Sequence, residues 1–362
     1  MKAATKYEKL DNLFLTAIND KVFPGAAFAF SIRDGSSYKR ITQAYGYART
    51  EPEKELLKMD TVFDLASLTK PLTTVPLLLS LFEKRSLFAE SSLQDLLEYC
   101  PNDKAEIKIH QLLSHSAGFP AHREYFHTLR KVPEKEKKRY LLQKILEEPL
   151  LYSPGKKHIY SDIGFILLGF IIENICGDNL DRLARNTIYR PLALENELFF
   201  PGLNDTEINY ASTGKCPWSD KMLSGVVHDD NCRSLGGVAG HAGLFGTVSG
   251  VLSMCELFLD QWLDKEKVHP AYSNRLLQRT LAPVADSGWT MGFDMVAEKG
   301  SSSGRYFSRN SVGHLGFTGT SFWIDSVREC VAVLLTNRVH PNGENWKIKE
   351  FRPKFHDLLM RK

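Results

Sequence analysis

Segments with the pattern of β-strands lie at both ends of this chain, separated by a long stretch with helical patterns. Near the N-terminus, GAAFAFSI and YKRITQAYGYA flank the turn sequence RDGSS, and near the C-terminus GHLGFTGTSFWID and CVAVLLTNR have the same β-rich character. We therefore expect an α/β (α+β) fold in which both termini build one antiparallel sheet flanked by helices. The sheet domain would comprise residues 1–66 and 285–362, with a mainly helical domain inserted at 67–284. A cleft between the two domains is the expected place for a site.

Charge and cysteine usage limit the expected partners. The 46 basic and 43 acidic residues leave a net charge of only +3, which gives no reason to expect nucleic acid. The six cysteines include no C-x-x-C pair, and their scatter favours reduced thiols in the cytoplasm. MKAATKYEKLDNLF lacks the apolar core of a signal peptide, and IGFILLGFIIENIC is too short to span a membrane. We expect a cytoplasmic chain without a membrane partner, or a periplasmic or secreted one if a leader has been removed.

The spacing Ser-x-x-Lys, which can place a nucleophile beside an amine, occurs four times. Three copies lie in turn-like sequence, whereas the copy in FDLASLTKPLTT follows an apolar segment and opens a helix. Residues three apart share a helix face, and a helix N-terminus favours anionic charge. Ser67 with Lys70 is therefore the candidate nucleophile, and the alternative is a simple N-cap serine. The four pairs are Ser36/Lys39, Ser67/Lys70, Ser153/Lys156 and Ser212/Lys215.

Two further triplets supply groups that a serine nucleophile needs. YSD places Tyr160 and Asp162 just before an apolar helix, and HLG places His314 beside Gly316 on an edge-like strand. A general base and an oxyanion hole are required for acyl transfer to serine. The alternatives are a core tyrosine and a surface histidine.

Similar triplets elsewhere lack this context. YSN at 272–274 precedes the amphipathic segment RLLQRTL, and HAG at 241–243 precedes a helix. We therefore set aside the copies at Tyr272 and His241 in favour of YSD and HLG as the motifs of the site.

Ser-x-x-Lys, Tyr-Ser-Asp and His-x-Gly, in this order and at these separations, resemble the motifs of the penicillin-recognising serine hydrolases. Within that superfamily the chain is similar to the branch of class C β-lactamases, DD-peptidases and family VIII carboxylesterases. VFPGAAFAF, IKIHQLLSHSAGFP and SPGKKHIYSDIGFILLG extend the likeness over nearly the whole chain. VVHDDNCRSLGGVAGHAGLF and LLTNRVHPNGEN resemble a subgroup that includes penicillin-binding protein 4B-like proteins and muropeptide amidases.

The resemblance implies a role for each matching residue. Ser67 would attack a carbonyl and form an acyl-enzyme, and Lys70 would share its proton and keep the pKa of the nearby phenol low. Tyr160 would act as general base and return the proton to the leaving group. The backbone N–H groups of Ser67 and Phe317, the residue after Gly316, would form the oxyanion hole. His314 would bond toward Tyr160 or the substrate.

Two positions depart from the family pattern. Asp162 stands where asparagine is frequent, and an aspartate there can pair directly with Lys70 and make the lysine more firmly cationic. Leu315 stands where threonine or serine is typical, and it has no donor for a substrate carboxylate. This departure favours a less acidic ester or amide over a penicillin or a C-terminal carboxylate. Arg338 is the alternative carboxylate contact, unless it is solvated.

The expected function is that of a β-lactamase-like serine hydrolase acting on a small ester or amide. The alternatives are a DD-peptidase or muropeptide amidase acting on peptidoglycan fragments, a true β-lactamase, and a catalytically retired binding protein. No cofactor or metal is expected, since no known zinc spacing connects the potential ligands in the glycine-rich segment. That segment would instead form a wall of the cleft. The potential ligands are His228, Asp229, Asp230 and His241.

Overall fold

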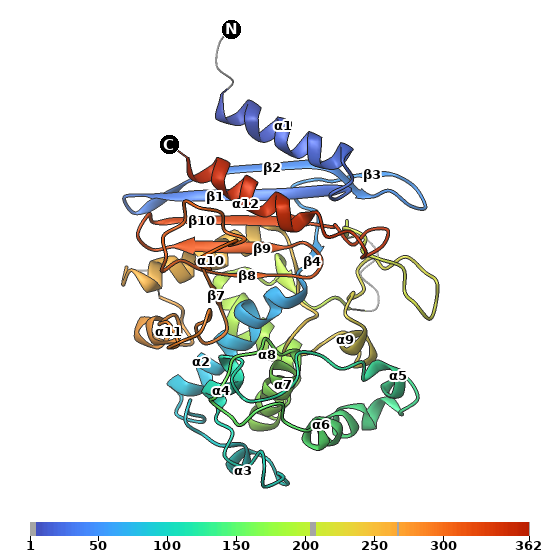
Figure 1. The fold of residues 1–362 in the computed structure, drawn as a ribbon, viewed down its shortest axis with the longest axis vertical. Coiled ribbons are helices and arrows are strands. Elements are labelled where there is room, and N and C mark those ends of the chain that lie inside the picture. Colours follow the sequence, from blue (N-terminus) through green and yellow to red (C-terminus); the bar gives the residue numbers. More distant parts are fainter. Residues whose placement is uncertain (1–4, 203–207, 266–267, 362) are drawn as a thin grey trace.

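A computed structural model describes residues 5–202, 208–265 and 268–361, so the first four residues of the stretch searched for a signal peptide lie outside it. Its main feature is a seven-stranded antiparallel sheet in the order β3-β2-β1-β10-β9-β8-β7 (Figure 1). N-terminal β1 pairs with C-terminal β10 from Ala26 opposite Thr336 to Ile32 opposite Cys330, which confirms that both termini build one sheet. The strands are β1 (Gly25–Asp34), β2 (Ser37–Arg49), β3 (Glu55–Leu56), β7 (Asp294–Met295), β8 (Val312–Leu315), β9 (Ser321–Asp325) and β10 (Cys330–Thr336).

The central strands are buried on both faces. Alternate side chains of β1 and β10, such as Phe28 and Leu334, join α1 (Lys6–Asn19) and α12 (Ile348–Met360) in one apolar cluster. The side chains between them, such as Ala29 and Val333, belong to the larger cluster that includes the helical part. This alternation follows from the two-residue period of a strand, and it explains why CVAVLLT is apolar throughout.

The second face of the sheet is covered by α10 (Val248–Trp262), which lies in the stretch assigned to the helical insertion. Tyr38 Oη of β2 donates to Asp260 Oδ1 at 2.8 Å, and Arg40 of β2 pairs with Glu256. The inserted stretch is therefore not wholly separate from the sheet, because a sheet with two apolar faces needs a cover on each. The division into two domains with these boundaries stays a prediction.

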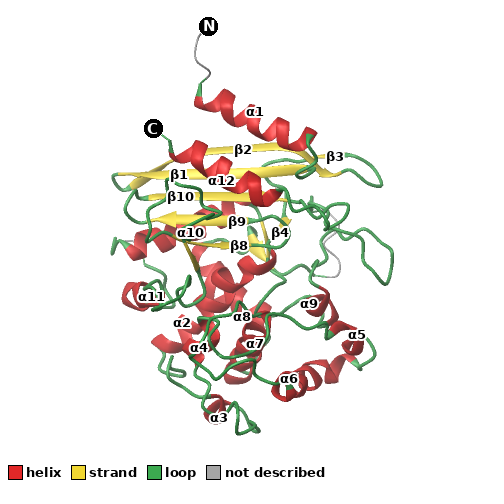
Figure 2. Cartoon of the chain, in the orientation of Figure 1, coloured by secondary structure: helices red, strands yellow, loops and turns green. Residues whose placement is uncertain are grey.

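The remaining helices gather beside the end of the sheet that holds β8 and the short edge strand β7 (Figure 2). The predicted apolar helix is α7, which ends at Gly177 in the left-handed conformation (φ +65°), as the C-cap signal indicated. No single described helix is long and apolar enough to cross a membrane; α7 and the segment Leu180–Leu192 pass that test only as a pair, bent by 75°. The helices are α2 (Val75–Glu83), α3 (Leu93–Leu96), α4 (Ile109–Leu113), α5 (Phe126–Leu129), α6 (Lys137–Glu147), α7 (Asp162–Cys176), α8 (Leu180–Leu183), α9 (Asp230–Ser234) and α11 (Asn274–Thr280).

Two prolines lie within helices without ending them. Pro76 lies in the first turn of α2, where a missing N–H group is not needed by the helix. Pro353 lies inside α12, which continues through it instead of being interrupted. Phe351 and Phe355 on either side of Pro353 are buried against the sheet, so tertiary packing outweighs the lost hydrogen bond.

Candidate active site

Ser67 follows a turn that is fixed by three side-chain hydrogen bonds. β4 (Phe63–Asp64) ends at Asp64, whose Oδ1 accepts from the amide of Ala66 at 2.8 Å. Ala66 has a left-handed backbone (φ +48°), which costs on the order of 1 kcal/mol for a residue with a side chain. Thr69 Oγ1 donates to the Ala66 carbonyl at 2.7 Å and accepts from the Leu244 amide at 3.1 Å. The turn leaves Ser67 partly exposed at the start of the helical run.

Lys70 lies one turn later, where a π-helical turn (Lys70–Thr74) leads into α2. Its Nζ donates to Ser67 Oγ at 3.0 Å, to Asp162 Oδ1 at 2.7 Å and to the carbonyl of His241 at 3.2 Å. Burial alone would lower the pKa of Lys70, but the charges of Asp162 and Tyr160 outweigh it and raise the pKa. The direct Lys70–Asp162 pairing predicted from the sequence is confirmed.

Only this pair among the four Ser-x-x-Lys pairs, all of which are described, has a hydrogen bond between the hydroxyl and the ammonium group. Because Lys70 rests as a cation that donates to Ser67 Oγ, it is not positioned to accept the hydroxyl proton. A separate acceptor is therefore needed for the proton of Ser67.

Tyr160 supplies a phenol beside both residues. It lies just before Ser161, the N-cap of α7, and Lys70 Nζ is 4.9 Å from the centre of its ring. Burial raises the pKa of Tyr160 to about 12, although the nearby ammonium of Lys70 opposes this shift. The expectation that Lys70 keeps this pKa low is therefore wrong: the phenol rests protonated, because loss of water around it outweighs the charge of one lysine.

His115 orients the tyrosine and was missed in the sequence. Its Nδ1 accepts from the Ser161 amide at 3.1 Å, and its ring lies 4.7 Å from that of Tyr160. Burial, helped by the charge of Lys70, holds the pKa of His115 well below its usual value, so the ring is neutral. The only available signal was the resemblance of LLSHSAGF to a family segment, which names no role for the histidine.

His314 faces the site from β8 as an acceptor. Its Nδ1 is bonded to the carbonyl of Leu315 at 3.0 Å, and since a carbonyl can only accept, Nδ1 carries the proton. Burial lowers the pKa of His314, so the neutral ring presents the lone pair of Nε2, which has no partner in the described part of the chain. No hydrogen bond joins it to Tyr160, whose ring is 6.0 Å away. Of the two expected contacts, the one with Tyr160 is therefore absent.

Phe317, one of the two proposed oxyanion donors, lies on a turn that is bonded to the segment before Ser67. Thr318 Oγ1 donates to the Asp64 carbonyl at 2.8 Å, and Thr320 Oγ1 donates to the Leu65 carbonyl at 3.1 Å. A Cβ at Gly316 would lie 2.0 Å from Thr320 Oγ1, so the turn requires glycine there. Among the described residues, neither the Ser67 amide nor the Phe317 amide donates a hydrogen bond, which leaves both free for a substrate.

Arg338, which lies beside this turn, does not have either of the two environments expected from the sequence. It is neither solvated nor placed to meet a carboxylate, because it is buried and its Nε donates to the Phe317 carbonyl at 2.9 Å. The phenyl ring of Phe317, in contrast, is 48% exposed, and Leu315 on β8 is partly exposed. The substrate-facing surface of the turn is therefore apolar.

His241, which was discounted, belongs to the site through its backbone. Its carbonyl accepts from Lys70, and its buried ring is bonded through Nε2 to Asp229 Oδ1 at 3.0 Å. Asp229 in turn caps α9 by accepting from the Cys232 amide at 2.7 Å. The ring of His241 therefore does not take the place expected for His314, and its segment contributes to the site through the main chain.

The other residues considered as metal ligands have separate contacts. Asp230 is paired with Arg233, and the ring of His228 stacks on that of Phe317 at 5.7 Å. No group of three or more potential ligands is arranged for a metal ion within the described residues.

A second histidine, missed in the sequence, contacts Asp162. His122 Nδ1 lies 3.5 Å from Asp162 Oδ2, and this interaction raises the pKa of His122. Burial would raise the pKa of Asp162, but Lys70 and His122 hold it well below its usual value. Asp162 is therefore an anion that bridges a buried ammonium and a half-exposed imidazole.

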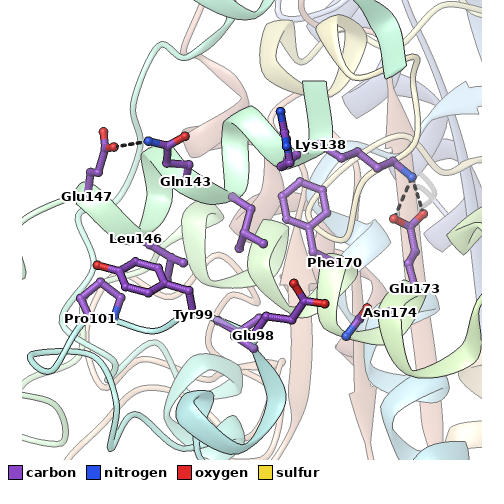
Figure 3. Close-up of a pocket in the computed structure, with 13 residues that line it drawn as sticks. Glu98, Tyr99, Pro101, Lys138, Gln143, Leu146, Glu147, Phe170, Glu173 and Asn174 are labelled. Atoms are coloured by element: carbon purple, nitrogen blue, oxygen red, sulfur yellow. Dashed lines mark hydrogen bonds and ion pairs between the residues drawn. The ribbon is translucent and has the colours of Figure 1, made fainter. Parts of the chain in front are cut away.

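A separate cavity of about 610 Å³ lies between α6, α7 and the segment 97–101 (Figure 3). Its walls include Tyr99, Leu146 and Phe170, and Lys138 is paired with Glu173 at 2.7 Å on one side. It shares no residue with the Ser67 cluster, so it gives no information on the chemistry there.

The comparisons with known proteins agree with this geometry. The family model described as Beta-lactamase matches residues 10–351. The chain belongs to the β-lactamase family. It is a serine hydrolase with the β-lactamase fold, which confirms the family, fold class and enzyme class predicted from the sequence.

Its relatives have different activities in their names. The chain is 30% identical to a putative D-alanyl-D-alanine carboxypeptidase of Escherichia coli O157:H7, over 94% of this chain and 84% of that protein. It is 31% identical to an N-acetylmuramyl-L-alanine amidase of Bacillus subtilis (strain 168), over 88% and 78%. Among solved structures, EstCE1, a hydrolase with promiscuous acyltransferase activity, superposes with a TM-score of 0.75 over 98% of both chains at 19% identity, a likeness in fold alone.

Proposed function

We propose that the chain hydrolyses amide bonds in peptidoglycan fragments through an acyl-enzyme on Ser67. The observation that carries the chemistry is the hydrogen bond from Lys70 Nζ to Ser67 Oγ, with the ring of Tyr160 centred 4.9 Å from the same ammonium. A partly exposed hydroxyl, a fixed cation and a proton-transfer group together meet the requirements for nucleophilic catalysis by serine. The relative named as an amidase supports the amide substrate.

Proton transfer follows from the resting states of the side chains. Ser67 Oγ attacks the carbonyl carbon, and its proton passes to the Tyr160 oxygen as the proton of Tyr160 passes to the leaving nitrogen. The C–N bond breaks, and an ester between Ser67 and the acyl group remains. Water then attacks this ester, and its proton returns through Tyr160 to Ser67 Oγ, which releases the acid. Lys70 stays an ammonium and stabilises the negative charge that develops on Ser67 Oγ and on the Tyr160 oxygen.

The substrate class follows from two residues that reduce affinity for carboxylates. Leu315 offers no hydrogen-bond donor beside the proposed oxyanion hole. Asp162 as an anion cancels the charge of Lys70, so the site has one positive charge fewer than it would have with asparagine. Both features disfavour a leaving group that bears a carboxylate, such as the terminal residue of a D-Ala-D-Ala peptide.

A D-Ala-D-Ala carboxypeptidase is the second candidate. The relative with that name favours it. The cytoplasmic location suggested by the cysteine pattern stays a prediction.

A panel of substrates tests the choice. We expect the purified chain to release the peptide from an N-acetylmuramyl peptide faster than it releases D-alanine from a D-Ala-D-Ala peptide, with short acyl esters as a control for acylation. A fluorescent penicillin should label Ser67 slowly or not at all. Faster release of D-alanine, or stable penicillin labelling, would favour the carboxypeptidase instead.

Replacement of Leu315 by threonine tests the reason for this preference. We expect Leu315→Thr to raise the rate of acylation by penicillin about tenfold, because one hydrogen bond to a charged group contributes about 1.5 kcal/mol or more. The rate on a short neutral ester should change little, and it provides the internal control. Unchanged penicillin acylation would show that the missing hydroxyl is not what excludes carboxylates.

A further inference from the structure

Two buried arginines hold the turn that carries Phe317. Arg352 of α12 donates through Nη2 to the carbonyl of Gly316 at 3.1 Å and to that of Thr320 at 2.8 Å. Arg338, which follows β10, donates through Nε to the carbonyl of Phe317 at 2.9 Å. Neither guanidinium forms an ion pair with a carboxylate in the part of the chain that the structure describes.

An unpaired cation in the interior is unfavourable, and the lowered pKa values of the two guanidinium groups reflect this cost. Burial lowers the pKa of Arg352 to about 9 and that of Arg338 to about 10. Buried charges are usually paired, and the carbonyl oxygens bonded to Arg352 are weak compensation. Arg338 also lies over the rings of Phe317 and Trp346, at 4.7 Å and 4.4 Å from their centres. A stable fold could place an uncharged side chain at either position, which raises the question of what the charges do.

The two arginines are bonded to carbonyls of different peptide units. The Gly316 carbonyl and the Phe317 N–H group belong to one peptide unit, and this N–H is the proposed oxyanion donor. The Phe317 carbonyl belongs to the next peptide unit, whose N–H is that of Thr318. A cation bonded to a carbonyl withdraws electron density through the planar amide and makes the N–H of the same unit a stronger donor. Only Arg352 is therefore bonded to the peptide unit that would contact the oxyanion.

The turn is also fixed with respect to Ser67. Thr318 and Thr320 donate to the carbonyls of Asp64 and Leu65, which are three and two residues before the nucleophile. The arrangement is rigid, so a change of charge on Arg352 acts on a donor whose place is already set.

We propose that Arg352 is a positioning residue whose charge, through the Gly316 carbonyl, strengthens the Phe317 N–H group as an oxyanion donor. This inference rests on the proposed acyl-enzyme on Ser67. The charge stabilises a tetrahedral adduct, in which the oxygen is anionic, more than it stabilises a bound neutral substrate.

The test compares Arg352→Met with Arg338→Met, two losses of a buried cation bonded to neighbouring carbonyls. The measurements are the rate of labelling of Ser67 by a fluorophosphonate, the affinity for phenylboronic acid, and the melting temperature. We expect Arg352→Met to lose about 10-fold to 100-fold in both labelling rate and boronate affinity, less than the loss of a whole oxyanion donor. Arg338→Met should lose a similar amount of thermal stability, but less than about threefold in boronate affinity.

Substitutions that separate charge from hydrogen bonding complete the test. Arg352→Lys keeps a cation and should retain most of the boronate affinity, whereas Arg352→Gln keeps a neutral donor and should lose it. This pair decides the matter if Arg352→Met does not fold. Equal boronate affinities for lysine and glutamine, or equal losses for Arg352→Met and Arg338→Met, would overturn the proposal while Ser67 stays labelled. Absence of labelling in the wild type would instead contradict the proposed function itself.

Discussion

A fluorophosphonate probe labels the wild-type chain and leaves Ser67→Ala unlabelled; this is the expected result with the largest effect. The hydroxyl of Ser67 is the partly exposed oxygen that Lys70 and Tyr160 both contact. Without it no acyl-enzyme can form, so hydrolysis of a short ester should fall on the order of 10⁵-fold. The fold should be kept, because alanine removes only one hydrogen bond from the cluster.

The chain contains its own controls for this result. Ser36→Ala and Ser153→Ala remove exposed serines with the same spacing to a lysine, but neither hydroxyl is bonded to its lysine. Both variants should be labelled as fast as the wild type. Labelling of Ser67→Ala at an undiminished rate would show that the probe reacts elsewhere, and it would remove Ser67 as the nucleophile.

The sequence predicted the partners of Ser67 because each one opens or ends a recognisable element. Tyr160 lies just before the N-cap of the apolar helix α7, Asp162 opens that helix, and His314 lies one residue before the end of β8. Short motifs at element ends have few possible orientations, so their order along the chain is informative. The paired termini were predictable for a similar reason, since each β-rich hairpin leaves one strand with an unpaired edge that the other hairpin can satisfy.

The sequence could not predict contacts that use the main chain or depend on burial. The His241 carbonyl bonds Lys70 whatever side chain it bears, so no residue pattern records it. The predicted direction of the shift in the Tyr160 pKa was wrong. A neighbouring charge can be recognised from a motif, whereas desolvation depends on every residue packed around the ring. The same limit applies to α10: its apolar pattern predicts a buried face, but not that this face packs on the sheet.

The buried cation of Lys70 leads to the second prediction. In Lys70→Met, Asp162 keeps its place but loses the ammonium 2.7 Å away. Removal of one partner of a buried ion pair typically destabilises a protein by about 3–5 kcal/mol. We expect a loss of this size in the free energy of unfolding, measured by urea denaturation, together with a fall in ester hydrolysis of about 10³-fold or more.

A double substitution separates the two effects. Lys70→Met with Asp162→Asn removes both charges, so it should recover most of the lost stability while hydrolysis stays low. Stability would then depend on charge compensation, and activity on the ammonium itself. If the double variant is as unstable as Lys70→Met alone, the uncompensated carboxylate is not the cause of the loss.

Lys104 provides the matched control for burial of a lysine. Its side chain is 3% exposed, and its Nζ pairs with Asp103 at 2.7 Å, but that carboxylate is 56% exposed. Asp162 is only 19% exposed, and Lys70 is fully buried. In Lys104→Met, water can solvate the freed carboxylate, so the loss of stability should be well below that of Lys70→Met and hydrolysis should not change. Equal losses in the two variants would mean that the stability comes from the lysine stem and not from the pairing of its charge with Asp162.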